Sequence, residues 1–321
     1  MSEKKPGTLL VSRGSKENVD DDAADIKSGH SQIRSFDVSK EGDEQDFMDG
    51  ELLGWGLRNS VGVVEHPDSG GIWAVENSVD QLERKGKDIH QDNPAEELNY
   101  LGTVEKPDGG NHGYPLCLSV WQTKDFPELG KLKTGDQFPF NDAKDVTDDM
   151  CNSKYKTPRL VFQAHTAPLD IKFDKDASNA YIAFHGSCKS HSPLIAFITN
   201  ISGDRSDPVG YKIASVAFGK DGQPTSAKDS MDAEKDIVTN PDTSKCPDSC
   251  FRPVGLAWDS KGRLWFSSDS TGEVFVMQYN ASAGGDGGSG GADDTKNTGL
   301  SVSPASVGAV VAAGLVAMLL A

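Results

Sequence analysis

The chain has 321 residues, of which 49 are acidic and 32 are basic, so its formal net charge is -17. Because phosphate binding needs a basic face, this charge argues against nucleic acid as a partner, and a solvated, secreted surface is its plainest interpretation. The length is enough for one large all-β domain or two ordinary ones, and a hydrophobic content of 36% with 34 glycines predicts long polar loops and many tight turns.

The start of the chain predicts two strands, over residues 8–12 and 32–39, joined by an acidic loop over 17–26. The residues before them contain no apolar stretch and are not a signal peptide. Since a strand already begins at residue 8, we expect that the natural N-terminus is missing and that this sequence begins inside a β-sheet unit.

Three later stretches repeat one unit: a polar or cationic residue, a strand, a turn and a second strand that carries Trp or Tyr. The units begin at Arg58, His165 and Arg252. A unit that recurs between long loops predicts a β-propeller, in which the first strand of each blade lines a central channel. The three leading side chains would then converge near one axis, and such a ring suits a small anionic or highly oxygenated ligand.

Roughly three to four such units are visible, whereas a propeller closes with roughly 4–8 blades. We therefore expect roughly two further blades in the sequence before residue 1. The leading residues also have a plainer interpretation, since most Arg side chains are exposed structural groups and a single His is more often structural than catalytic.

His165 and His185 lie at the start and the end of neighbouring predicted strands, where a channel-facing imidazole is a candidate general base or hydrogen-bond donor. Four other histidines fall in predicted loops and are interpreted as solvated: His66, His90, His112 and His191.

The segment over 92–99, Asp-Asn-Pro-Ala-Glu-Glu-Leu-Asn, combines side-chain carboxylates with turn carbonyls. An irregular loop of this kind suits Ca²⁺, which takes roughly 6–8 oxygen ligands; a turn with helix-capping acids is the alternative. We expect a surface insertion with little periodicity over 118–157, which allows a single helical turn, and a polar loop over 220–247. Further strands are predicted over 194–201, 211–218 and 272–277.

Cysteine spacing predicts two disulfides. Cys246 and Cys250 flank a short Pro-Asp-Ser loop, and Cys117 and Cys151 bracket the polar insertion, which a bridge would pin. Cys188 is left over. A zinc site is disfavoured because no Cys-x-x-Cys pair occurs.

The C-terminal end predicts an anchor signal. Residues 306–321 are an apolar run shorter than a membrane span of roughly 20 residues, and a linker rich in Gly, Ser and Asp precedes them over 281–305. This order is typical of a glycosylphosphatidylinositol (GPI) signal; a short tail anchor is the alternative. With sequons at Asn200 and Asn280, it predicts a secreted, cell-surface glycoprotein whose propeller domain spans 1–280.

Seven motifs, in this order, resemble the glucose/sorbosone dehydrogenases, and most closely the fungal quinoprotein pyranose dehydrogenases, over roughly residues 6–280. They are Gly56-Leu-Arg-Asn-Ser60, Val75-Glu-Asn77, Asp92-Asn-Pro-Ala-Glu-Glu-Leu-Asn99, Gly113-Tyr-Pro115, Ala164-His-Thr-Ala-Pro-Leu169, Phe184-His-Gly-Ser187 and Arg252-Pro-Val-Gly-Leu256.

The resemblance implies a six-bladed β-propeller that holds pyrroloquinoline quinone (PQQ) and Ca²⁺ over the channel mouth. A pyranose sugar would lose a hydride from C1 to the quinone and give the lactone, and an external acceptor such as a cytochrome would take the electrons. By this resemblance Arg58 and Asn59 contact the quinone's reactive carbonyl region. Backbone oxygens near Gln91 and Asp92 would hold the Ca²⁺, which acts as a Lewis acid.

The same resemblance makes His185, Lys189 and Arg252 cofactor contacts, with Lys189 and Arg252 facing the carboxylates of PQQ. In the family the catalytic base is a His just upstream of the strand that matches residues 6–13, and no His here replaces it by position. We therefore expect an incomplete form that lacks its base.

Two other functions remain open: a non-catalytic cell-surface propeller that binds glycans or proteins, and a Ca²⁺-dependent lactonase. The sequence has no Gly-x-Ser-x-Gly elbow, no His-Glu-x-x-His and no phosphate-binding Gly loop. Serine hydrolases, zinc proteases and nucleotide enzymes are thus disfavoured.

Overall fold

The structure is a computed structural model that describes residues 1–39, 45–187, 207–279 and 300–304. Strands dominate this part of the chain, and its single α-helix, α1, spans Asp148–Lys154. The all-β prediction is confirmed. Within the same residues, no helix is both long and apolar enough to cross a membrane.

Four antiparallel sheets form the architecture, and in each of them the strands hydrogen-bond in chain order, as in a propeller blade. The first sheet contains β1 (Thr8–Arg13), β2 (Gln32–Asp37) and β3 (Glu51–Trp55), and the second contains β4 (Ser60–Glu65), β5 (Gly71–Glu76), β8 (Glu96–Thr103) and β11 (Leu160–Phe162). The third contains β12 (Pro168–Phe173), β13 (Asn179–Phe184), β14 (Lys212–Ala217) and β15 (Glu234–Thr239), and the fourth contains β16 (Pro253–Trp258), β17 (Leu264–Ser268), β18 (Glu273–Tyr279) and β19 (Leu300–Pro304).

Shorter ribbons and 3₁₀ helices lie in the connections between these strands. Two small ribbons are β6 (Glu83–Arg84) with β7 (Lys87–Asp88), and β9 (Cys117–Ser119) with β10 (Gln137–Pro139). The 3₁₀ helices span Asp21–Ala24, Ile26–Ser28, Phe47–Asp49, Phe140–Asp142 and Thr243–Lys245.

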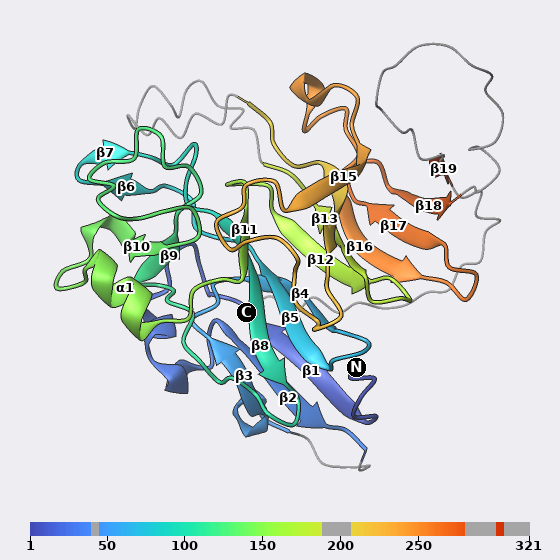
Figure 1. Cartoon of the computed structure of the whole chain (residues 1–321), viewed down its shortest axis with the longest axis horizontal. Helices are drawn as coiled ribbons and strands as arrows, with labels where there is room; N and C mark the ends of the chain where they lie inside the picture. The colour runs from blue at the N-terminus through green and yellow to red at the C-terminus, as the bar shows by residue number, and fades with distance from the viewer. Residues whose placement is uncertain (40–44, 188–206, 280–299, 305–321) are drawn as a thin grey trace.

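Successive sheets lie beside one another in chain order (Figure 1). The innermost strands touch in sequence: β1 lies against β4, β4 against β12, and β12 against β16. The side chain of Asp170 in β12 accepts a hydrogen bond from the backbone N–H of Leu256 in β16, at 2.8 Å. This order of the first strands is the arrangement that the three repeated units predict.

The hydrophobic core lies between the faces of neighbouring sheets. Ile33 and Leu53 of the first sheet pack with Ile72 of the second, and Trp73 of the second packs with Ile171 of the third. A further cluster joins the third and fourth sheets through Ala183, Ile213, Leu256, Leu264, Phe266 and Met277. The second and third sheets, which have a neighbouring sheet on each side, therefore bury both faces, and β5, in the interior of the second sheet, is buried at every position.

The predicted insertion over 118–157 contributes Leu118, Phe126 and Phe138 to an apolar cluster that also contains residues from other segments, such as Leu82 and Ile89. The Cys117–Cys151 disulfide closes it and Cys246–Cys250 closes a second loop, so both predicted pairings are confirmed. The insertion is more helical than the single turn expected there, since α1 has seven residues and the 3₁₀ helix Phe140–Asp142 precedes it.

One predicted loop is wrong. Residues 220–247 contain β15, a strand whose sequence, Glu-Lys-Asp-Ile-Val-Thr, is too polar to be recognised by alternating hydrophobicity. Lys212 of β14 pairs with Glu234 and Asp236, at 2.7 Å each, and Ile237 and Val238 of this outermost strand pack against the core cluster of the third and fourth sheets. The strand expected over 194–201, Cys188, both sequons and the predicted anchor signal lie outside the described residues.

Candidate functional site

Three of the sheets present the start of their first strand and the end of their second strand at one common edge. Ser60 pairs with Glu76, Pro168 with Phe184, and Pro253 with Ser268. The residues that flank these pairs form what we call the rim: Arg58, Asn77, His165, His185, Arg252 and Asp269.

Hydrogen bonds between sheets make the rim continuous. The Asn77 side chain donates to the carbonyl oxygen of Pro168 at 2.7 Å, which joins the second sheet to the third. Arg252 donates through Nε to the carbonyl oxygen of His185 at 3.3 Å and through Nη2 to that of Gly186 at 2.8 Å, which joins the third to the fourth. The structure thus brings the leading residues of the three repeats to one side of the molecule.

The guanidinium of Arg58 is held by neutral oxygen atoms. Nε donates to the carbonyl oxygen of Asn18 at 3.1 Å and Nη2 to the Asn18 side-chain oxygen at 3.0 Å. Nη1 donates to the carbonyl oxygen of Asn77 at 3.3 Å. Asn59 follows, half-buried, and its carbonyl oxygen accepts the backbone N–H of Asn77 at 3.1 Å. Nothing in the sequence marks Asn18, which lies in the acidic loop after β1.

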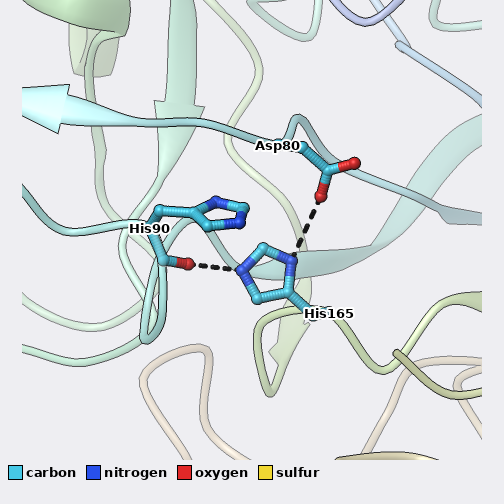
Figure 2. A group of neighbouring side chains, drawn as sticks. All are labelled: Asp80, His90 and His165. Carbon is cyan, nitrogen blue, oxygen red and sulfur yellow. Dashed lines mark hydrogen bonds and ion pairs between the residues drawn. The ribbon is translucent and has the colours of Figure 1, made fainter. Parts of the chain in front are cut away.

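Asp80, His90 and His165 meet in one cluster (Figure 2). His165 donates from Nε2 to the carbonyl oxygen of His90, and its Nδ1 lies 3.5 Å from Oδ1 of Asp80. The two rings pack with centroids 4.4 Å apart. His165 has a φ of 65°, in the left-handed region that residues other than Gly rarely adopt, and this conformation is typical of functional sites.

The ligand atoms of this trio lie within 4.8 Å of one another, close enough to consider a metal ion. His90, however, accepts the backbone N–H of Gln81 at Nδ1, at 2.9 Å, so the neutral ring carries its hydrogen on Nε2. Burial, and next the charge of His165, lower the pKa of His90 to about 4, so the ring is neutral at pH 7. Only His165 and Asp80 then offer lone pairs, which makes the trio a hydrogen-bonded cluster rather than a complete metal site.

The predicted Ca²⁺ residues Gln91 and Asp92 directly follow His90 and are exposed. They line a concavity of about 360 Å³ together with Lys87, Asp88, Ile89, Asn93, Lys124, Asp125 and Phe126. The His90–His165 hydrogen bond places this segment beside the rim.

The second half of the predicted calcium segment is a strand and not a loop. Glu96 and Glu97 belong to β8 and are buried. Glu96 accepts the backbone N–H groups of Ser78, at 2.7 Å, and Ala167, at 3.3 Å, so it ties β8 to the starts of two rim segments. Burial raises the pKa of Glu96, and hydrogen bonding to Ser78 opposes this effect. These carboxylates therefore support the rim from inside instead of facing an ion in solvent.

A second buried carboxylate stands behind Arg58. Glu76 accepts the backbone N–H of Arg58 at 2.8 Å, and the Asn99 amide bridges Glu76 and Glu97, at 3.1 and 2.9 Å. Burial, and next the charge of Glu97, raise the pKa of Glu76 well above its ordinary value.

At the far side of the rim, His185 Nε2 lies 3.0 Å from both carboxylate oxygens of Asp269. Burial and then the charge of Arg252 lower the pKa of His185, and Asp269 opposes them. The Arg252 guanidinium lies over the ring of Tyr211, 5.5 Å from its centroid. Lys189 lies outside the described residues.

The prediction that the loop histidines are solvated is wrong for three of them. His66, His90 and His112 are 1%, 3% and 3% exposed, because the tertiary packing of sheets and loops covers these side chains. His191 lies outside the described residues.

The chain is similar to a known protein family and to several known proteins. The family described as TrAA12-like matches residues 1–280. A pyrroloquinoline quinone-dependent sugar dehydrogenase of Hypocrea jecorina is 52% identical, over 89% of this chain and 63% of its own length. This chain thus spans less than two thirds of that relative.

Two solved structures are similar over 86% of the chain. The calcium structure of a Trichoderma reesei carbohydrate-active enzyme of family AA12 has a TM-score of 0.79, with 53% identity and 66% of that chain covered. The holo form of the pyranose dehydrogenase PQQ domain from Coprinopsis cinerea has a TM-score of 0.74, with 35% identity and 68% covered. From the match over residues 1–280 and these relatives, we conclude that the chain belongs to the TrAA12-like family.

Proposed function

We propose that the complete protein is a quinoprotein that binds PQQ and Ca²⁺ at the rim and oxidises the C1 hydroxyl of a pyranose sugar to the lactone. One observation carries this proposal. Arg58 and Arg252 are half-buried at the rim, yet within the described part of the chain neither pairs with a carboxylate. In a protein with a net charge of -17, two guanidinium groups that have no carboxylate within ion-pairing distance among the described residues favour an anionic ligand.

The chemistry of PQQ fits these residues. It carries three carboxylates and a pair of quinone oxygens, and a planar guanidinium binds either kind of oxygen through two parallel donors. The described partners of Arg252 use Nε and Nη2, which leaves Nη1 to meet a carboxylate. Arg58 and Asn59 would donate to the quinone oxygens, and His185 and Lys189 would complete the contacts.

Bound PQQ supplies the hydride acceptor, and bound Ca²⁺ polarises it. The residues of this chain supply position and charge. Backbone oxygens of Gln91 and Asp92 would hold the ion, because their segment is fixed beside the rim by the His90–His165 contact. The names of the relatives, a PQQ-dependent sugar dehydrogenase and a PQQ domain of a pyranose dehydrogenase, support this assignment.

The proposal extends to the whole protein. We infer a six-bladed ring to which residues 1–280 contribute the described sheets, an external electron acceptor such as a cytochrome, and secretion to the cell surface with a GPI anchor signal at 306–321. The contacts between successive first strands support the ring, since each added sheet continues the same side-by-side order.

A titration of the chain with PQQ, followed by fluorescence quenching with Ca²⁺ or with EDTA, tests the proposal. We expect saturable binding that needs Ca²⁺ and that weakens roughly tenfold to a hundredfold in Arg252→Ala, since a charge-assisted hydrogen bond contributes about 1.5–3 kcal/mol. Arg263→Ala is the matched control, because Arg263 lies at the opposite end of the same hairpin and pairs with Asp259. Equal binding by both variants, or none by the unaltered chain, would remove the rim as the cofactor site.

A further inference from the structure

We propose that Asn18 is the positioning residue of the rim: it holds the Arg58 guanidinium in place through neutral oxygens and thereby keeps its positive charge available to an anionic ligand. That Asn18 holds Arg58 in place concerns this chain alone. That the charge serves an anionic ligand rests on the proposed function.

Asn18 binds Arg58 as a carboxylate would, but without a charge. Two donors of one guanidinium, Nε and Nη2, meet two oxygens of one residue, at 3.1 and 3.0 Å. This two-point contact fixes the plane of the guanidinium. An Asp or Glu partner would hold the plane equally well and would also neutralise the charge, so it would compete with any anion that approaches the rim.

The Asn18 side chain is itself fixed on its other side. Its amide donates to the carbonyl oxygen of Asp80 at 2.7 Å, and its oxygen accepts the backbone N–H of Asp80 at 2.8 Å. Asp80 in turn faces Nδ1 of His165. One half-buried residue therefore links the leading residue of the first repeat to that of the second.

The loop that carries Asn18 is anchored as well. Tyr114 donates its hydroxyl to the Asn18 carbonyl oxygen at 3.2 Å and accepts the backbone N–H of Asp20 at 2.7 Å. The third acceptor for Arg58, the carbonyl of Asn77, belongs to the segment that runs on to Asp80. Removal of the Asn18 side chain alone should therefore free the Nη2 end of the guanidinium without unfolding the loop, while backbone carbonyls still hold Nε and Nη1.

Three variants of the full chain test this inference: Asn18→Ala, Asn18→Asp and the control Asn179→Ala, whose side chain bonds Asp174 at the other end of β13. The first readout is the Nη2 proton signal of Arg58 in NMR spectra, assigned with Arg58→Lys, and it needs no cofactor. We expect Asn18→Ala, which removes the Oδ1 acceptor of Nη2, to lose the downfield, slowly exchanging Nη2 signal, and Asn18→Asp and Asn179→Ala to keep it. An unchanged signal in Asn18→Ala would overturn the positioning role.

The second readout is the PQQ affinity in the presence of Ca²⁺. We expect a loss of about tenfold in Asn18→Ala and a similar or larger loss in Asn18→Asp, where Arg58 stays ordered but neutralised. Unaltered affinity in Asn18→Asp would overturn the argument for a neutral clamp. If the unaltered chain binds no PQQ, the proposed function fails, while the NMR signal still decides whether Asn18 positions Arg58.

Discussion

Gly62 and Asp170 lie where the innermost strands of the second and third sheets come closest: a Cβ built on Gly62 would stand 2.8 Å from the Cα of Asp170. Asp170 also accepts the backbone N–H of Leu256 in the next innermost strand. This close approach of β4 to β12 holds together the strands that begin at the rim, so side-chain volume at Gly62 bears directly on the geometry of the site.

Gly62→Ala should destabilise the fold by about 1–3 kcal/mol, because a backbone atom must move to admit the methyl group. Gly255 is the matched control. It occupies the corresponding place in β16, where the nearest atom to an added Cβ, Oγ of Ser267, is 3.6 Å away, so Gly255→Ala should change stability by less than about 1 kcal/mol. Urea unfolding of both variants measures the difference, and similar losses would contradict the close-approach argument.

His112→Gln should remove part of the acid sensitivity of the fold. The His112 ring is buried, its Nδ1 bonds the Asn99 side-chain oxygen at 3.2 Å, and burial lowers its pKa to about 4. Because the folded state binds this proton less readily than the unfolded state, His112 costs stability as the pH falls from about 6.5 towards 4.

Between pH 7 and pH 5 this effect of His112 amounts to roughly 2 kcal/mol. We therefore expect the free energy of unfolding of the unaltered protein to fall by that much more than that of His112→Gln, measured by urea unfolding at both pH values. The Gln amide can still donate to Asn99. Parallel pH profiles would show that His112 is already charged in the folded protein.

Glu97→Gln should protect the fold at alkaline pH. Burial, and next the charge of Glu97, raise the pKa of Glu76, and burial raises the pKa of Glu97 itself. A carboxyl group whose pKa is raised on folding lowers the stability of the protein as the pH rises from about 4.5 through the pKa of the folded state. Replacing one charge of the pair relieves this loss.

We expect the free energy of unfolding of the unaltered protein to fall more steeply than that of Glu97→Gln between pH 4.5 and pH 8. The difference between the two falls should be about 1 kcal/mol or more. The exposed Glu128, which lies 3.8 Å from Lys85, provides the control Glu128→Gln, for which no pH-dependent difference is expected. A pH-independent effect at position 97 would mean that Glu76 and Glu97 do not repel each other.

Removing the Cys117–Cys151 disulfide, as Cys117→Ala with Cys151→Ala, should cost about 2–4 kcal/mol. It closes a loop between residues 34 apart in sequence, whereas Cys246–Cys250 joins residues only 4 apart. The chain-entropy account therefore predicts a smaller loss for the second pair. Thermal unfolding of the two double variants compares them; an equal or reversed order would show that local strain outweighs loop entropy.

Much of the fold was predictable from local patterns. The strand-turn-strand repeats that begin at Arg58, His165 and Arg252 identified the first strands of three sheets, because hairpins are encoded by alternating residues and turn residues close in sequence. The two disulfides followed from spacing in the same way. The strand β15 was not predicted, because its sequence is polar and shows no alternation of hydrophobic and polar residues. One of its charged residues, Glu234, pairs with Lys212.

The sequence by itself determined which residues stand at the rim, since a residue that precedes a strand in a repeated unit must occupy the same edge in every copy. Only the tertiary structure decided what those residues touch. Asn18 meets Arg58 across 40 positions of sequence, and His90 meets His165 across 75, contacts that no local pattern encodes. They form because sheets stacked on buried faces bring distant loops to one edge, where each buried donor must find an acceptor.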